Sequence, residues 1–330
     1  MYKLAYGPMS LEIIKAIYQY SHINLTPLMI IASKNQIDYD YGYVCNTKQS
    51  KQIFENMKKE YPRANILICR DHCGPGFKYN HNTLEQVKQT IKEDIECGYQ
   101  LIHIDLCHIM GSIEDKIVET CKLIKYAQSI NNNIRFEIGT DENDGKIVFN
   151  LGQIKDNLDR ITGVCTPMFY VVQTGSLVIE NKNTGIFCSQ ELKQTSQLLN
   201  DYNVGIKEHN ADYLNESQIK DRQGIISALN IAPQLGVIQT CHIINQCNIF
   251  GVDYQQFLYT VITSDKWMKW TSKKDNHLKL ILSGHYHFNS KEYLILINQL
   301  SKYINVEESI INEITKNIDY YRKNFYENSK

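Results

Sequence analysis

The residues best suited to chemistry are an adjacent aspartate and histidine, Asp71 and His72. They directly follow the short apolar run of residues 66–69, which is typical of a buried strand. A carboxylate and an imidazole at a strand end can bind a metal ion and transfer a proton. The alternative is an aspartate that caps the next segment beside a solvated histidine. The glycines of the following Gly74-Pro75-Gly76 support the first interpretation, because glycine lets the backbone approach a ligand closely.

Polar residues end several other apolar stretches in the same way. They are His103 with Asp105, Glu137, Gln173, and Glu208 with His209. Because His103 and Asp105 are two positions apart, they share one face of a strand, either the inside of the sheet or its helix-covered side. For Glu208 and His209 the alternative is an acidic helix N-terminus beside an exposed histidine. We predict that these strand ends surround one pocket.

The types of these side chains indicate which metal would suit the pocket. Imidazole and carboxylate ligands with an open coordination position suit Zn²⁺ first, and Mn²⁺, Co²⁺ or Ni²⁺ are alternatives. An active site without cysteine ligands is expected. Near the C-terminus, His285 and His287 form an H-x-H pattern that can chelate a metal from a strand, although two surface histidines in a loop are more common.

The elements that must position these residues alternate between strand and helix along the chain. Strands are predicted at 28–32, 65–69, 101–105, 134–138, 168–173, 204–208, 225–231 and 278–282. Helices are predicted at 10–20, 47–59, 83–97, 112–129, 190–200, twice between 235 and 267, and at 291–303 and 307–326. Eight strands that are apolar on both faces and interleaved with helices predict an α/β protein with a closed (β/α)₈ TIM barrel.

The barrel is expected to form a single domain over residues 1–330, because no linker or repeat marks a boundary. Extra helices lie outside the barrel repeat, one at about 9–21 and others at about 290–328. No G-x-G-x-x-G follows any predicted strand, which argues against a dinucleotide-binding sheet. In a TIM barrel the reacting groups lie at the C-terminal ends of the strands, so Asn35 and Gln36, after the first predicted strand, join the candidate site.

Composition limits the classes of ligand. The 330 residues are 43% hydrophobic and 22% charged, with a net charge of −1, which gives no electrostatic reason to expect nucleic acid or an anionic membrane. Small polar metabolites are the expected ligands. No stretch approaches the roughly 18 uninterrupted apolar residues that a membrane span needs, and the N-terminus does not resemble an export signal. The ten scattered cysteines are interpreted as reduced thiols of a cytoplasmic protein, with Cys73 beside His72 the one of interest.

Taken together, these segments resemble a known family. From about residue 27 to 288 the chain is similar to the non-catalytic subunit of class II tagatose-bisphosphate aldolase, a (β/α)₈ relative of the class II fructose-bisphosphate aldolases. The most specific similar segments are Asn35-Gln36, Asp71-His-Cys-Gly-Pro75 and Glu208-His-Asn-Ala-Asp-Tyr213. Weaker similarity lies at 42–43, 102–105, 138–140, 171–175 and 231–233.

The resemblance implies a role for each candidate residue. Class II aldolases use a divalent metal, held largely by histidines, to stabilise an enediolate, while an aspartate beside a ligand histidine moves the proton of the C4 hydroxyl. By position, Asp71 resembles that acid/base, His72 and His209 resemble metal ligands, and Glu137 resembles a metal-associated glutamate. We add Glu208 as a second catalytic candidate. The expected substrate contacts are Asn35, Gln36, Asp105, Gln173, Ser176 and His285.

The chain departs from the family pattern at four places. These are Arg70 where a glycine is usual, residues 140–145 in place of a glycine-rich acidic loop, Gln173-Thr-Gly175 in place of Gln-Pro-Gly, and His285-Tyr-His-Phe288 in place of Arg-Tyr-Tyr-Trp. The last change removes an arginine that suits a phosphate. Arg70 or Lys34 is the expected replacement charge.

The sequence therefore predicts a metal-dependent aldolase or sugar 4-epimerase that acts on the C3–C4 bond of a ketose or ketose phosphate. The alternative is a non-catalytic subunit that stabilises a true aldolase subunit, and a third candidate is a metal-free sugar-binding barrel. A homo-oligomer is also compatible with the pattern. Catalysis is favoured because the acid/base, ligand and carboxylate positions all keep chemically competent side chains, which a silent subunit does not need.

Overall fold

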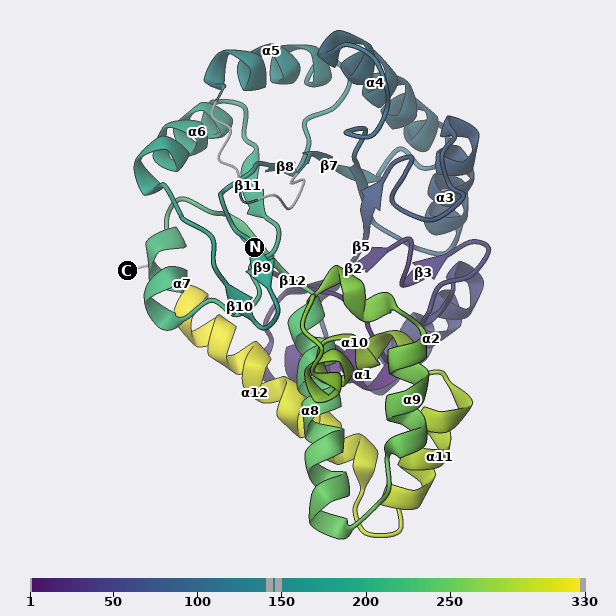
Figure 1. Ribbon diagram of the computed structural model, residues 1–330. Helices are drawn as coiled ribbons and strands as arrows, with labels where there is room; N and C mark the ends of the chain where they lie inside the picture. Colours follow the sequence, from purple (N-terminus) through teal and green to yellow (C-terminus); the bar gives the residue numbers. More distant parts are fainter. Residues whose placement is uncertain (1, 141–144, 146–149, 327–330) are drawn as a thin grey trace.

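Eight parallel strands close into a barrel in the computed structural model, which describes residues 2–140, 145 and 150–326 (Figure 1). Around the barrel the order is β1-β12-β11-β8-β7-β6-β5-β2. The bounds are β1 (Leu4–Tyr6), β2 (Leu28–Ser33), β5 (Ile66–Cys73), β6 (Leu101–Ile104), β7 (Arg135–Gly139), β8 (Phe169–Val171), β11 (Gly205–Glu208) and β12 (Ala228–Ile231). The predicted TIM barrel is confirmed.

Helices surround the barrel and extend it on one side. They are α1 (Leu11–Asn24), α2 (Thr47–Glu60), α3 (Leu84–Glu96), α4 (Ile113–Ile130), α5 (Leu151–Ile161), α6 (Ser189–Asp201), α7 (Glu216–Arg222), α8 (Pro233–Phe250), α9 (Gln255–Thr263), α10 (Asn276–Ser283), α11 (Lys291–Leu300) and α12 (Val306–Tyr326), with 3₁₀ turns η1 (Lys266–Lys269) and η2 (Gly284–His287). Figure 1 shows α8, α9 and α11 projecting beside the barrel, and α12 running back to α7. None of the described helices is both long and apolar enough to span a membrane.

Short hairpins and ladders complete the described structure. β3 (Ile37–Asp38) pairs in parallel with β4 (Cys45–Asn46), and β9 (Val178–Ile179) pairs antiparallel with β10 (Lys182–Asn183). Asn46, Thr83, Ser112 and Asn215 each begin a helix with a reciprocal capping box, so the sequence fixes these helix starts locally.

Two apolar layers fix which side chains face the inside of the barrel. The interior is filled by Ala5, Met29, Ile31, Leu67, Cys69, Leu101, Phe169 and Ala228, and a larger core lies between strands and helices. Side chains alternate along a strand, so a residue two positions after an interior residue also faces inward. On β6, for example, His103 follows Leu101 on the interior face. The choice that the sequence left open for His103 is thus decided in favour of the barrel interior.

The eighth strand was predicted in the wrong place. Residues 278–282 belong to α10, because Asp275 caps this segment by accepting the backbone N–H groups of His277 and Leu278. The missing strand is β1, which pairs with both β12 and β2 and is completely buried. A three-residue strand is too short to show a sequence period. Helices α5 and α7 were also not predicted, and the predicted end of the last helix at 328 lies outside the described residues.

Candidate active site

Four titratable side chains, two from β5, one from β6 and one from the end of β11, meet at the C-terminal mouth of the barrel. Asp71, His72, His103 and His209 each offer one ligand atom within 4.8 Å of the others. Nδ1 of His209 lies 3.2 Å from Nε2 of His72, and Oδ1 of Asp71 lies 3.6 Å from Nδ1 of His103. The structure thus brings together Asp71, His72 and His209, which the sequence predicted to share a site.

An irregularity in β5 turns both Asp71 and His72 toward the mouth. In a regular strand, adjacent side chains point to opposite faces. Here the pairing of β5 with β6 shifts between Arg70 and Cys73, and His72 has a φ of +44°. This left-handed conformation is uncommon for a residue other than glycine, and such conformations gather at functional sites. The backbone N–H of His72 donates to Nδ1 of His103, 3.2 Å away, which holds the irregular turn in place.

Each imidazole is anchored through one ring nitrogen. Nδ1 of His72 lies 2.7 Å from Oδ2 of Asp105, Nε2 of His209 lies 3.0 Å from Oε1 of Glu137, and Nε2 of His103 lies 2.8 Å from the carbonyl oxygen of Gly139. Carboxylate and carbonyl oxygens only accept, so these nitrogens carry the protons. His72 and His209 are thereby left with their second nitrogens facing each other. This is how outer carboxylates orient metal-binding histidines in proteins.

The donor set fits a divalent metal ion. Oδ1 of Asp71 is buried and has no hydrogen-bond partner among the described residues, which is rare for a carboxylate oxygen. It lies 4.0 Å from Nε2 of His72, which in turn lies 3.2 Å from Nδ1 of His209. Ligands at about 2.1 Å from a tetrahedral ion would be about 3.4 Å apart, so the cluster is close to the required size. His103 fits less well, because its Nδ1 already accepts the N–H of His72.

The charges of the cluster are strongly coupled. Burial alone would raise the pKa of Asp71, but His72, His103 and His209 hold that pKa well below its usual range. Burial lowers the pKa of His209 to about 4. For His72 burial works in the same direction, yet Asp71 and Asp105 raise its pKa to about 9. Near neutral pH in the absence of a metal, a proton on His72 therefore bridges the two imidazoles, and a cation bound there would replace it.

Comparison with known proteins places the barrel among aldolase-like folds. No family model matches the chain. A 6-phospho-5-dehydro-2-deoxy-D-gluconate aldolase of Halalkalibacterium halodurans is 28% identical over 131 residues, which span 40% of this chain and 40% of that protein. A probable tagatose 6 phosphate kinase from Sinorhizobium meliloti 1021 superposes with a TM-score of 0.81 over 97% of this chain and 99% of that chain, at 14% identity. The fructose-bisphosphate aldolase of Campylobacter jejuni superposes with a TM-score of 0.60 over 97% and 90%, at 12% identity.

The chain has the (β/α)₈ barrel fold of these proteins, and it is similar to aldolases in fold. At these identities the structural likeness shows the fold alone, so an activity must be argued from the site. The sequence match to the aldolase covers about two-fifths of each protein, so that protein's reaction enters only as support for a proposal.

Two predicted contact residues of the aldolase-like barrel prove to be orienting groups. Glu137, expected at the metal, accepts from Nζ of Lys207 at 2.5 Å and from His209. Asp105, expected to bind substrate, accepts from His72, from Oγ1 of Thr140 at 2.9 Å and from the N–H of Cys107 at 3.1 Å. Both carboxylates are almost fully buried. Asp105 therefore orients His72, and Glu137 orients His209, each through the ring nitrogen that faces away from the other imidazole.

Glu208 and Ser176 lie outside the mouth of the barrel. Lys207 and His209 face the interior, so strand alternation turns Glu208 outward. There Arg222 donates from Nε to Oε2 of Glu208 at 2.6 Å and from Nη2 to Oε1 at 2.8 Å, and the hydroxyl of Ser176 donates to Oε1. Neither residue lines the cavity at the mouth. This position contradicts a catalytic role for Glu208 and a substrate contact for Ser176, and we assign both to a buried ion-pair network.

The remaining predicted residues line cavities. A cavity of about 960 Å³ at the mouth is bordered by Asn35, Gln36 and His285 together with Asp71, His72 and His209. Oε1 of Gln36 accepts a hydrogen bond from the N–H of Ser33, 2.8 Å away. Gln173 instead lines an adjacent cavity of about 450 Å³ between the barrel, α4 and α5.

Two polar residues that line the mouth, Asn230 and Asp212, are not among the site residues predicted from the sequence. Asn230 on β12 lines the main cavity, and its buried Oδ1 has no partner among the described residues. Asp212 also lines this cavity and accepts the N–H groups of Ala232 and Gln234, which holds the loop after β12; burial raises its pKa to about 7. Asn230 could have been predicted from its spacing, because it lies two positions after the apolar strand residue Ala228 and therefore faces the same side of the strand.

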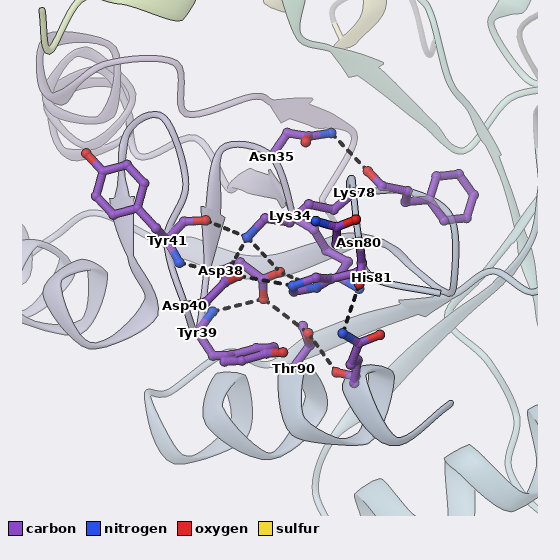
Figure 2. A network of polar contacts seen from close by, with 12 residues as sticks. Lys34, Asn35, Asp38, Tyr39, Asp40, Tyr41, Lys78, Asn80, His81 and Thr90 are labelled. Carbon is purple, nitrogen blue, oxygen red and sulfur yellow. Dashed lines mark hydrogen bonds and ion pairs between the residues drawn. The ribbon is translucent and has the colours of Figure 1, made fainter. Parts of the chain in front are cut away.

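Ion pairs join the loop of Asp38 and Asp40 to the loop of Lys78 and His81 (Figure 2). The ammonium group of Lys78 lies 3.5 Å from Oδ2 of Asp38 and contacts the carboxylate of Asp40, while His81 lies 3.0 Å from Asp40. The ring of Phe77, the residue before Lys78, stacks on His72 at a centroid distance of 4.7 Å. Asp38, Asp40 and His81 are close enough to hold a cation, but Lys78 already supplies the positive charge. We therefore assign no metal there.

Proposed function

We propose that the protein is a metal-dependent enzyme of the class II aldolase type that cleaves the C3–C4 bond of a ketose or ketose phosphate. One observation carries the proposal: His72 and His209 are oriented by carboxylates so that their free nitrogens meet beside an unpartnered buried oxygen of Asp71. The aldolase-like fold and the partial match to an aldolase of Halalkalibacterium halodurans support the same reaction class.

The metal would be held by His72 and His209, and zinc suits these ligands best. When bound, a divalent cation supplies a Lewis acid for the negative charge that develops on the substrate carbonyl oxygen. Asp105 and Glu137 keep the two imidazoles in position. Lys207, paired with Glu137 behind the histidines, keeps that carboxylate ionised and fixed.

Asp71 is the proposed acid/base. Its low pKa leaves it ionised at neutral pH, so it can accept a proton. It takes the proton of the C4 hydroxyl while the C4–O bond becomes a carbonyl and the C3–C4 bond breaks, with its electron pair passing to C3 of the other fragment. That fragment then takes a proton at C3 and becomes the second carbonyl product. Asn35 and Asn230, which border the same cavity, are placed to hold sugar hydroxyls.

We expect His72→Ala to lower the affinity for zinc by more than about 100-fold, because losing even an outer partner of a ligand costs 10–100-fold. Metal content of the purified protein and zinc titration measure the effect. His277→Ala is the matched control, since His277 is exposed at the start of α10. Equal zinc affinity in both variants would contradict the assigned site.

Activity is tested with a panel of ketoses and ketose phosphates plus added divalent metals, followed by NMR. Two carbonyl products would support the aldolase, and a single epimer would show the same bond chemistry without product release. A metal-free protein without turnover that stabilises a separate aldolase subunit would contradict the proposal and support the non-catalytic role.

A further inference from the structure

Neither cation expected to recognise an anion can do so. Arg70 is completely buried and donates to both carboxylate oxygens of Asp94, at 2.6 and 2.7 Å, and to the carbonyl groups of Ala32 and Ile37. Lys34 is 1% exposed, with its Nζ 3.5 Å from the carbonyl oxygen of Gly74. Both groups lie outside the residues that line the main cavity. If the substrate is anionic, other residues must bind its charge.

Two lysines of η1 border that cavity with no acidic partner. The ammonium groups of Lys266 and Lys269 lie over the rings of Tyr286 and Trp270, at 5.3 and 4.9 Å from the ring centroids. Within the described ranges neither lysine forms an ion pair, and both side chains are exposed. Asp265 borders the same cavity but forms no ion pair with either lysine among the described contacts. The aromatic rings therefore hold two positive charges in place without neutralising them.

A buried histidine beside these lysines is also unsatisfied. His285 is 1% exposed and lines the cavity, and neither of its ring nitrogens has a hydrogen-bond partner among the described residues. The rings of Tyr43, Trp270 and Tyr286 surround it at centroid distances of 6.2, 6.3 and 4.1 Å. A buried imidazole with both nitrogens unpartnered carries a desolvation cost, which a hydrogen bond to a ligand would offset.

We infer that Lys266, Lys269 and His285 form a subsite for the anionic end of the substrate, a terminal phosphate or carboxylate. The inference rests on the proposed function, because it takes the sugar to react at Asp71, His72 and His209 in the same cavity. Two ammonium groups give charge-assisted hydrogen bonds to an anion, and the imidazole adds a neutral donor. The positive charges of the subsite come from η1, whereas His285 belongs to η2.

The subsite is tested on the metal-free full-length protein with inorganic phosphate and with acetate as probes. Ring ¹H–¹⁵N signals of His285 are followed by NMR during each titration. We expect saturable shifts, and a Kd at least about tenfold weaker in Lys266→Met/Lys269→Met. Lys273→Met is the matched control, because Lys273 pairs with Glu180 outside the cavity and its loss should leave both titrations unchanged. Lys266→Arg/Lys269→Arg should restore binding.

The stronger of the two probes identifies the source of the charge: phosphate indicates a sugar phosphate and acetate a sugar acid. Absence of His285 shifts with both probes, or equal affinity in the double Met variant, overturns the subsite. Either result can occur with zinc binding and turnover intact, so it leaves the proposed function standing. Conversely, lysine-dependent phosphate binding without zinc binding would overturn the proposed function and retain the anion site.

Discussion

Asp71→Asn is expected to lower kcat by about 10²–10⁴-fold, the usual contribution of a general acid/base. The amide keeps the shape of the side chain but no longer takes up the hydroxyl proton. Folding should be unaffected, because Oδ1 of Asp71 makes no hydrogen bond within the described residues. The measurements are kcat at saturating substrate and zinc content of the same preparation.

The zinc content separates two possible roles of Asp71. If kcat falls while zinc is retained, Asp71 moves the proton; if both fall together, it is instead a ligand of the cluster. Asp105→Asn is the comparison variant, because it alters the group that orients His72 and should weaken zinc binding by about 10–100-fold. Near-normal kcat in Asp71→Asn would remove this residue from the mechanism.

The second large effect concerns stability. Asp94→Asn is expected to reduce the free energy of unfolding by about 3–5 kcal/mol, because it leaves the buried guanidinium of Arg70 without its counter-charge. Both side chains are 0% exposed. Burial opposes the charge of Arg70, and the carboxylate of Asp94 nevertheless keeps the pKa of Arg70 well above its usual value. Urea denaturation followed by circular dichroism measures the change.

Glu85→Gln serves as the control on the same helix, α3. Its pair with Lys88 is exposed, so no measurable change in the free energy of unfolding is expected. The same result in Asp94→Asn would mean that the carbonyl groups of Ala32 and Ile37 alone compensate Arg70.

Burial on both faces made most of the barrel strands predictable. The interior strand segments are short apolar runs, and such runs mark parallel strands that helices cover. The same rule failed at residues 278–282, which belong to the partly buried helix α10, and at β1, whose three residues depend on β2 and β12 for pairing. A short apolar run fits either a strand or a buried helix, so the run alone does not distinguish them. Element length and helix capping make that distinction.

The sequence by itself determined which side chains are available at the strand ends, and three of them, Asp71, His72 and His209, lie together at the mouth. Only the tertiary structure decided the direction of each side chain. Glu208 points outward beside an inward His209, because the pleat of β11 is set by its neighbours in the barrel. Direction depends on pairing between strands that are distant in sequence, and no local pattern records that pairing.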